Sequence, residues 1–172
     1  MLQKIRYNLS QEDIKLIGVH NYENIMASVM AVKEFGCSTI SIREVLKEFM
    51  GVEHRLEFVR EINGAKWYND SVSSSPTRTI AGLGSYNEEI ILIAGGYDKN
   101  LDYTPIARHI LDKVKVLILF GNTKQKIYDA VVNEKTNEDI SIYVCNSLDE
   151  VVNKAYEVAK EGQVVLFSPA SA

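Results

Sequence analysis

Three runs of apolar residues constrain this chain more than any other feature of its sequence. Residues 89–96 (EIILIAGG), 115–121 (KVLILFG) and 163–168 (QVVLFS) are almost continuously hydrophobic. A strand has this composition when both faces of its sheet are covered, which is the usual state of a parallel strand. Amphipathic segments with helix-start signals such as Thr104-Pro105 separate the runs. The alternation predicts an α/β fold with a Rossmann-like, mostly parallel sheet and helices on both faces.

A hairpin is expected to open this sheet. Asn63-Gly64 lies between two alternating segments, LEFVREI and AKWYND, and both turn residues tolerate the positive φ that a two-residue hairpin turn requires. The chain then enters a helix, for which Ser75 is the predicted cap and Pro76 the first residue.

A helical segment precedes the hairpin. Apolar side chains recur every three to four positions in residues 21–36, and the capping box at 41–44 (SIRE) starts a second helix. The periodicity changes from helical to strand-like near Gly51. The sequence therefore predicts two domains, residues 1–51 and 52–172.

Composition and charge narrow the class of protein. The net charge of −4 and the pI of about 5.4 argue against a nucleic-acid or membrane-surface partner, which clustered positive charge would indicate. No apolar run approaches the roughly 20 residues that span a bilayer. The first residues lack the apolar core of a secretory signal. We expect a cytoplasmic protein in which Cys37 and Cys145 are reduced.

Ligands of open α/β sheets bind beyond the carboxyl ends of the strands, so residues that follow each predicted strand are the site candidates. Asp70 ends the hairpin and is suited either to ligand hydroxyls, such as those of a ribose, or to closing a turn. Ser74 lies at a predicted helix start, where it binds an anionic ligand or caps the helix. Lys99 follows Gly95-Gly96 and offers a charge to a carboxylate or phosphate, unless it is only a solvated loop residue.

Signals elsewhere are weaker. Arg55 opens the first hairpin strand and is either a phosphate or ribose contact or a surface charge. Asn21 follows His20 at a helix start, where capping is a sufficient explanation. The patterns of a P-loop, a Cys/His zinc site and a nucleophile elbow do not occur in the sequence. The residues alone thus predict an anion-binding α/β domain with no catalytic and no metal-binding residue of its own.

Five motifs taken together resemble those of a known family. In the order and spacing of the Mur ligases of peptidoglycan synthesis, the chain carries GVHNYEN, EHRLEFV, WYNDS, GGYDK and VLFSPASA. NDS combined with GGYDK is similar to the branch that joins D-glutamate to UDP-N-acetylmuramoyl-L-alanine. The resemblance implies that residues 1–51 are the helical tail of a central ATPase domain. It also implies that residues 52–172 are most of a C-terminal, Rossmann-like, amino-acid-binding domain.

The resemblance also implies ligand contacts. The residues implied in ATP binding are Asn21 near the adenine, Asn24 beside it, Arg55, and Asp70 near the ribose. Ser74 and Lys99 are implied to bind the carboxylates of D-glutamate. One departure affects the second pair: many relatives have lysine after NDS, whereas this chain has Val72.

The implied reaction needs parts that this sequence does not contain. ATP phosphorylates the substrate carboxylate, and the D-glutamate amine then displaces phosphate. The P-loop, the Mg²⁺ ligands and the UDP site are expected upstream, and a serine and an aromatic residue that help to hold D-glutamate are expected downstream. We expect a fragment that is truncated at both ends, inactive alone and monomeric, with no nucleic-acid partner and no membrane insertion.

Two alternatives remain open at this point. The first is a ligase of the folylpolyglutamate synthase type, which shares the C-terminal fold but for which NDS with GGYDK is not expected. The second is a stand-alone, Rossmann-like anion-binding module without enzymatic activity.

The 172-residue chain alone is expected to turn over no ATP, because its sequence contains no phosphate-binding loop. The measurement is phosphate release by a preparation shown to be free of any longer ligase. Turnover above the buffer control would contradict this prediction.

Overall fold

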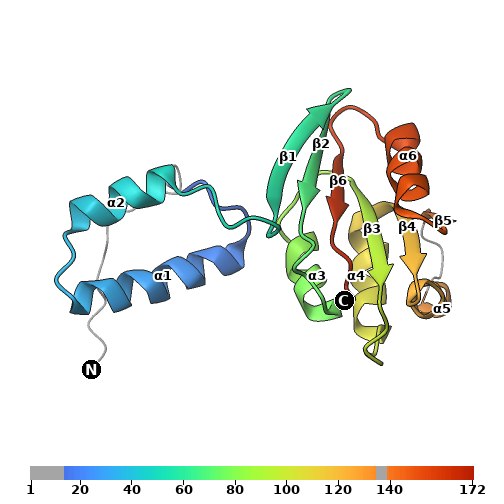
Figure 1. The fold of residues 1–172 in the computed structure, drawn as a ribbon, viewed down its shortest axis with the longest axis horizontal. Coiled ribbons are helices and arrows are strands. Elements are labelled where there is room, and N and C mark those ends of the chain that lie inside the picture. Colours follow the sequence, from blue (N-terminus) through green and yellow to red (C-terminus); the bar gives the residue numbers. More distant parts are fainter. Residues whose placement is uncertain (1–13, 135–138) are drawn as a thin grey trace. The chain divides into compact units, whose positions relative to one another are not determined.

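The computed structural model describes residues 14–134 and 139–172, so the first 13 residues of the predicted helical domain lie outside the described residues. The chain divides into two compact units, Met1–Gly51 and Val52–Ala172. Figure 1 shows the helices and strands of the two units.

The second unit is built on a six-stranded mixed sheet. Its strands are β1 (Glu57–Ile62), β2 (Ala65–Asn69), β3 (Ile90–Gly96), β4 (Val114–Gly121), β5 (Ser141–Val144) and β6 (Val164–Phe167). They lie in the order β1-β2-β6-β3-β4-β5, and β1 with β2 is antiparallel whereas every other neighbouring pair is parallel. The expected α/β fold with an opening hairpin is confirmed.

The hairpin turn forms where the sequence predicted it. Asn63 and Gly64 adopt φ values of 51° and 76°, the left-handed pair that a tight hairpin turn requires. Ile62 and Ala65 pair across the turn, and a bulge between Phe58 and Arg60 shifts the register farther along the ladder.

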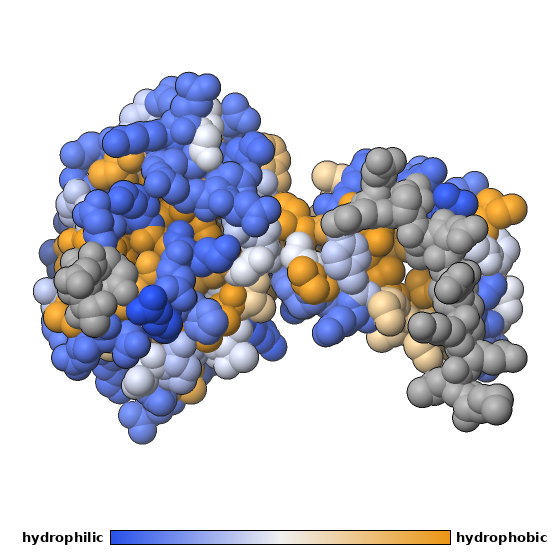
Figure 2. Space-filling view, turned by 180° about the vertical axis from the view of Figure 1, so that it is seen from behind, coloured by the Kyte–Doolittle hydropathy of each residue, from blue (hydrophilic) through white to orange (hydrophobic). Residues whose placement is uncertain are grey.

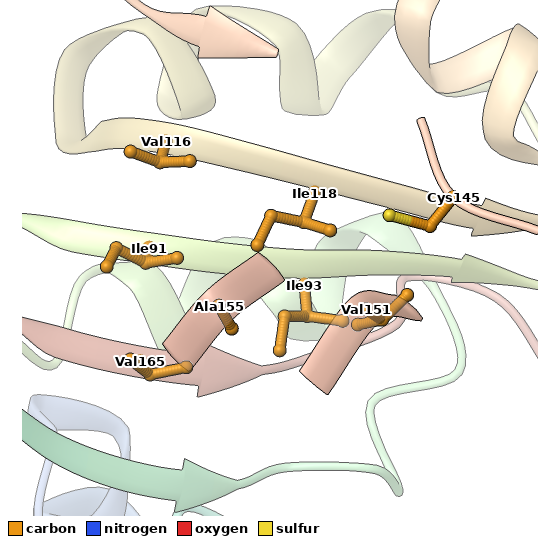
Figure 3. Close-up of a cluster of buried hydrophobic side chains, with 8 residues drawn as sticks. All are labelled: Ile91, Ile93, Val116, Ile118, Cys145, Val151, Ala155 and Val165. Atoms are coloured by element: carbon orange, nitrogen blue, oxygen red, sulfur yellow. The ribbon is translucent and has the colours of Figure 1, made fainter. Parts of the chain in front are cut away.

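Helices cover both faces of the sheet. Helix α6 (Leu148–Val158) packs over β3 and β4, where Val151 and Ala155 join the apolar cluster Ile91, Ile93, Val116, Ile118, Cys145 and Val165 (Figure 3). Side chains alternate along a strand, so Leu92 and its equivalents point to the opposite face. There α3 (Pro76–Leu83), α4 (Thr104–Lys113) and α5 (Lys124–Glu134) pack beside one another, with α4 and α5 on β4.

The first unit contains two described helices, α1 (Val19–Glu34) and α2 (Thr39–Glu48). Among residues 14–51 the buried apolar residues are few: Ile25, Val29 and Ile42. Many large apolar side chains are exposed instead, namely Val19, Met26, Met30, Phe35, Ile40, Val45, Phe49 and Met50. Apolar surface among polar surface is visible on this unit in Figure 2. The helix pair therefore buries little of its own apolar surface.

One predicted cap was wrong in position, and another was confirmed in position but not in its hydrogen bond. Helix α2 is capped by Ser38, whose Oγ accepts from Ser41 N at 3.0 Å, so the cap lies three residues before the predicted one, Ser41. Ser75 occupies the capping position of α3, but its side chain makes no capping hydrogen bond. Residues 147–150 (SLDE) have the sequence pattern of a capping box, which predicts the start of α6, and the main bond of this box forms because Ser147 Oγ accepts from Glu150 N at 3.2 Å.

Strands β3 and β4 approach each other closely at their carboxyl ends. A Cβ on Gly95, at φ +117°, would lie 2.0 Å from the carbonyl oxygen of Phe120. A Cβ on Gly121, at φ +67°, would lie 2.8 Å from the backbone of Gly96. Glycine is thus required here both for its conformation and for the absence of a side chain.

Gly95→Ala is expected to lower the free energy of unfolding by at least about 3 kcal/mol, because strain from positive φ and a backbone clash add up. The measurement is urea denaturation of the chain followed by circular dichroism.

Gly162→Ala is the matched control. Gly162 has φ +81°, and nothing lies within 4 Å of its added Cβ. It isolates the conformational strain, about 1–2 kcal/mol. Equal losses for the two variants would contradict the close approach of β3 and β4.

Candidate functional site

The carboxyl ends of β2, β6, β3 and β4 lie at one edge of the sheet. The registers place Asn69 beside Phe167, and Gly96 beside Gly121. Polar loop residues follow each of these strands, in segments 70–75, 168–172, 97–103 and 122–123. Because β6 lies between β2 and β3, the segments that carry Ser74 and Lys99 start from strands about 10 Å apart.

Asp70 is buried at this edge rather than exposed on it. Its side chain is 2% exposed, and Oδ1 accepts from Leu56 N at 3.3 Å while Oδ2 accepts from Ser168 Oγ at 2.7 Å. Ser168 Oγ also lies 2.9 Å from Thr79 Oγ1. The carboxylate therefore joins the ends of β2 and β6 to the residue before β1. The ribose contact implied for Asp70 stays a prediction, and the described contacts give the side chain a structural role.

Tyr86, whose pKa is affected by the charge of Asp70, is also buried. The hydroxyl of Tyr86 is buried and has no hydrogen-bond partner in the described structure. Burial, followed by the charges of Tyr68, Asp70 and Glu88, raises the pKa of Tyr86 above its ordinary value. The Asp70 end of the site is thus buried within the fold.

Arg55 is exposed on a loop whose backbone is fixed on both sides. His54 and Leu56 have positive φ values of 66° and 47°, a conformation that non-glycine residues seldom adopt. Hydrogen bonds hold this strained turn: His54 N donates to Glu57 Oε2 at 2.8 Å, and Leu56 N donates to Asp70. Asp70 therefore anchors the loop that presents the Arg55 guanidinium to solvent.

Ser74 lies just before α3 and is half-buried. Its backbone N–H donates to Val72 O at 2.9 Å, and no partner of its hydroxyl occurs among the residues that the structure describes. Together with Ser75, which makes no capping bond, it leaves free hydroxyls at a helix start, where the helix dipole favours negative charge.

Lys99 extends from the loop after β3. It is exposed and has no hydrogen-bond or ion-pair partner within residues 14–134 and 139–172. Its neighbour Asp98 is held in place by Lys126 at 2.7 Å and by the amide of Asn100. These two hydrogen bonds, the Lys126 bond first, lower the pKa of Asp98. The loop is thus fixed while the ammonium group of Lys99 is available for a ligand.

Thr123 and Ser171 take part in hydrogen bonds at the carboxyl ends of the strands, which the sequence did not indicate. Each follows a predicted strand, 115–121 for Thr123 and 163–168 for Ser171, but the sequence assigned neither residue a partner. Both are buried, at 0% and 1% exposure, and their hydroxyls lie 2.8 Å apart. The available signal was a threonine two residues after a strand-ending glycine, but the partner is 48 positions away in the chain.

Asn21 and Asn24 lie on α1 in the first unit, whereas the other candidate site residues belong to the second unit. Asn21 Nδ2 donates to Ile17 O at 2.6 Å, and Asn24 Nδ2 donates to Asn21 Oδ1 at 3.2 Å. The two amides thus order each other. Asn21 is half-buried and Asn24 is exposed.

The described residues contain neither a candidate metal-binding cluster nor a membrane-spanning helix. They contain no group of three or more His, Cys, Asp or Glu side chains that could hold a metal ion. None of the described helices has the length and apolar character needed to cross a membrane.

Comparison with known proteins identifies relatives. Residues 54–171 match the family described as Mur ligase, glutamate ligase domain. The chain is 49% identical over 165 residues to the UDP-N-acetylmuramoylalanine–D-glutamate ligase of Clostridium novyi, covering 94% of this chain and 35% of the relative. It is 51% identical over 165 residues to the ligase of the same name from Acetivibrio thermocellus, covering 93% of this chain and 35% of that relative. The chain therefore spans about a third of these relatives.

Solved structures share the fold at low sequence identity. The UDP-N-acetylmuramate–alanine ligase of Thermotoga maritima aligns with a TM-score of 0.73 at 19% identity, over 92% of this chain and 36% of that one. A folylpolyglutamate synthase of Mycobacterium tuberculosis aligns with a TM-score of 0.65 at 14% identity, over 92% and 39%. At such identities the likeness concerns the fold alone.

Asp70→Asn is expected to destabilise the chain by about 1–3 kcal/mol, because asparagine keeps only one acceptor oxygen, so either Leu56 N or Ser168 Oγ loses its acceptor in a buried position. Urea denaturation without ligand measures this. Asp112→Asn is the control, because it removes a carboxylate paired with Arg108 on the surface and costs at most about 1 kcal/mol. Equal stability of the two variants would contradict the structural role of Asp70.

Proposed function

This chain belongs to the Mur ligase family through its glutamate ligase domain, and from that premise we propose that it forms the C-terminal part of an ATP-dependent ligase. The proposed reaction adds D-glutamate to UDP-N-acetylmuramoyl-L-alanine in peptidoglycan synthesis. The observation that carries the proposal is the 49–51% identity, over almost the entire chain, to ligases named for this reaction. The nucleotide-linked substrate fits a cytoplasmic enzyme.

The contribution of this chain is to hold and orient the incoming amino acid. The Lys99 ammonium and the Ser74 hydroxyl have no partner among the described residues and extend from the same edge of the sheet. We assign to them the two carboxylates of D-glutamate, because charged and hydroxyl donors match carboxylate acceptors. Held in this way, the amine attacks the activated carboxylate of the other substrate, a step that depends mainly on positioning.

Nucleotide binding is assigned to Arg55, Asn21 and Asn24. The exposed guanidinium of Arg55 is suited to phosphate or ribose oxygens, and we propose that Asp70 supports it by anchoring Leu56. ATP, when bound, supplies the phosphoryl group that activates the substrate carboxylate. The described residues do not fit a Mg²⁺ site, so we assign the metal ligands to the part of the ligase outside this chain.

The first unit is proposed to be the helical tail of the central ATPase domain. Its exposed apolar side chains, such as Phe35 at 89% and Ile40 at 71%, support this assignment, because such surface is usually covered in a folded protein.

A folylpolyglutamate synthase is the main alternative. Its support is a shared fold, at 14% identity to the Mycobacterium tuberculosis enzyme. The much higher identity to D-glutamate ligases favours the proposed reaction. A panel of carboxylate substrates offered to the full-length ligase, including UDP-N-acetylmuramoyl-L-alanine and a folate, tests the choice directly. Use of the folate alone would overturn the proposal.

In the full-length ligase, Lys99→Ala is expected to raise the KM for D-glutamate by roughly tenfold to a hundredfold, because a charged hydrogen bond contributes about 1.5–3 kcal/mol. The KM for ATP is expected to stay close to that of the parent. Steady-state phosphate release, with each substrate varied in turn, is the measurement.

Lys115→Ala is the matched control. Lys115 is also partly exposed, but it lies at the start of β4, at the opposite edge of the sheet, and pairs with Asp139. An unchanged KM for D-glutamate and an unchanged kcat in Lys99→Ala would refute the assignment of Lys99.

A further inference from the structure

Three buried hydroxyls form a chain of hydrogen bonds at the carboxyl end of β3. Ser171 Oγ lies 2.8 Å from Tyr103 Oη and 2.8 Å from Thr123 Oγ1. Thr123 Oγ1 accepts from Gly96 N at 3.0 Å and lies 3.4 Å from Gly96 O. When Tyr103 donates to Ser171, Ser171 to Thr123, and Thr123 to Gly96 O, every hydroxyl proton has an acceptor. The chain of hydroxyls therefore ends on the backbone that leads to Lys99.

The segment 168–172, which carries Ser171, is bonded on both of its sides. One side reaches the loop that carries Ser74, and the other reaches the end of β3 and the loop that carries Lys99. On the first side, Ala170 N donates to Ser73 O at 3.0 Å. On the second side, Gly95 N donates to Pro169 O at 2.8 Å, and Tyr97 N donates to Ala172 O at 2.6 Å. The segment thus connects the two loops that carry the candidate ligand groups.

We propose that Thr123 and Ser171 are positioning residues that fix the separation between Ser74 and Lys99, and thereby the length of dicarboxylate amino acid that the site accepts. The inference rests on the proposed function, because a ligand with two carboxylates needs two binding groups at a set distance. Thr123 and Ser171 are too buried to touch a ligand, at 0% and 1% exposure. Their effect runs through segment 168–172 and through Gly96.

The hydroxyl of Thr123 joins Ser171 to the backbone of Gly96, so the proposed positioning depends on it. Thr123→Val keeps the shape of the side chain but leaves the N–H of Gly96 without its side-chain acceptor in a buried place, which is costly, and leaves the Ser171 hydroxyl with Tyr103 alone. The end of β3 then loses this side-chain bond, while the Lys126–Asp98 pair still holds the loop that follows. Thr123→Ser keeps the hydroxyl and is the conservative variant.

The test is steady-state kinetics of the full-length ligase that we propose to contain this chain, with D-glutamate and the shorter D-aspartate as competing acceptors. In Thr123→Val, the KM for D-glutamate is expected to rise about tenfold while the KM for ATP stays unchanged. The preference for D-glutamate over D-aspartate, as a ratio of kcat/KM values, is expected to fall at least about threefold. Thr123→Ser is expected to restore both values.

Val131→Ala separates positioning from stability. Val131 is fully buried on α5, the helix that follows Thr123, and its side chain has no polar atom to join the hydroxyl chain. We expect this variant to lower the Tm without changing the D-glutamate to D-aspartate ratio. If Thr123→Val behaves like Val131→Ala, the hydroxyl chain is only structural and the inference is overturned.

A second comparison tests whether the two hydroxyls act together. Ser171→Ala combined with Thr123→Val is expected to change the KM no more than Thr123→Val alone, because both disrupt one chain of bonds. Fully additive effects would contradict this. A parent ligase without D-glutamate-dependent turnover would overturn the proposed function itself, whereas an active parent with an unaffected Thr123→Val variant would overturn only the positioning role.

Discussion

The arrangement of the sheet edge follows from the need to pair the backbone of β3 at its carboxyl end. This strand is buried on both faces between β6 and β4, so water does not reach its N–H and C=O groups. Along the strand the two neighbours provide the partners. At the end, Gly95 N pairs with Pro169 O, and Gly96 pairs with the side chain of Thr123 and the amide of Asn122. The loops after β6 and β4 are therefore held against β3 by the same requirement.

That requirement also decides which polar side chains at the edge are available to a ligand. Thr123 is buried where its side chain completes the hydrogen bonding of Gly96, and Ser171 is buried where it bonds to Thr123. Ser168 and Asp70 are buried where their side chains bond to each other. Lys99 and the hydroxyl of Ser74 have no such bonds to complete in the described structure. A polar residue after a strand is thus either part of the fold or part of the site, and its burial separates the two.

The sequence predicted those structural elements that a few adjacent residues encode. The apolar runs, Asn63-Gly64 and the capping box at Ser147 each encode an element within a few residues, and each formed in the expected place. The start of α2 was missed because two serines three positions apart both carry a capping signal, and the earlier one serves.

The burial of Asp70 had no local signal, because its partner Ser168 is 98 positions away. The same holds for Thr123 and Ser171. Resemblance to the Mur ligases indicated that these segments meet, but not which side chains the meeting would bury. The fold is shared at 14–19% identity with solved ligases of other names, and at such identities only the fold is comparable. Under the proposed function, selectivity for the amino acid depends on the few exposed side chains at the edge and on the buried contacts that we propose to fix their spacing.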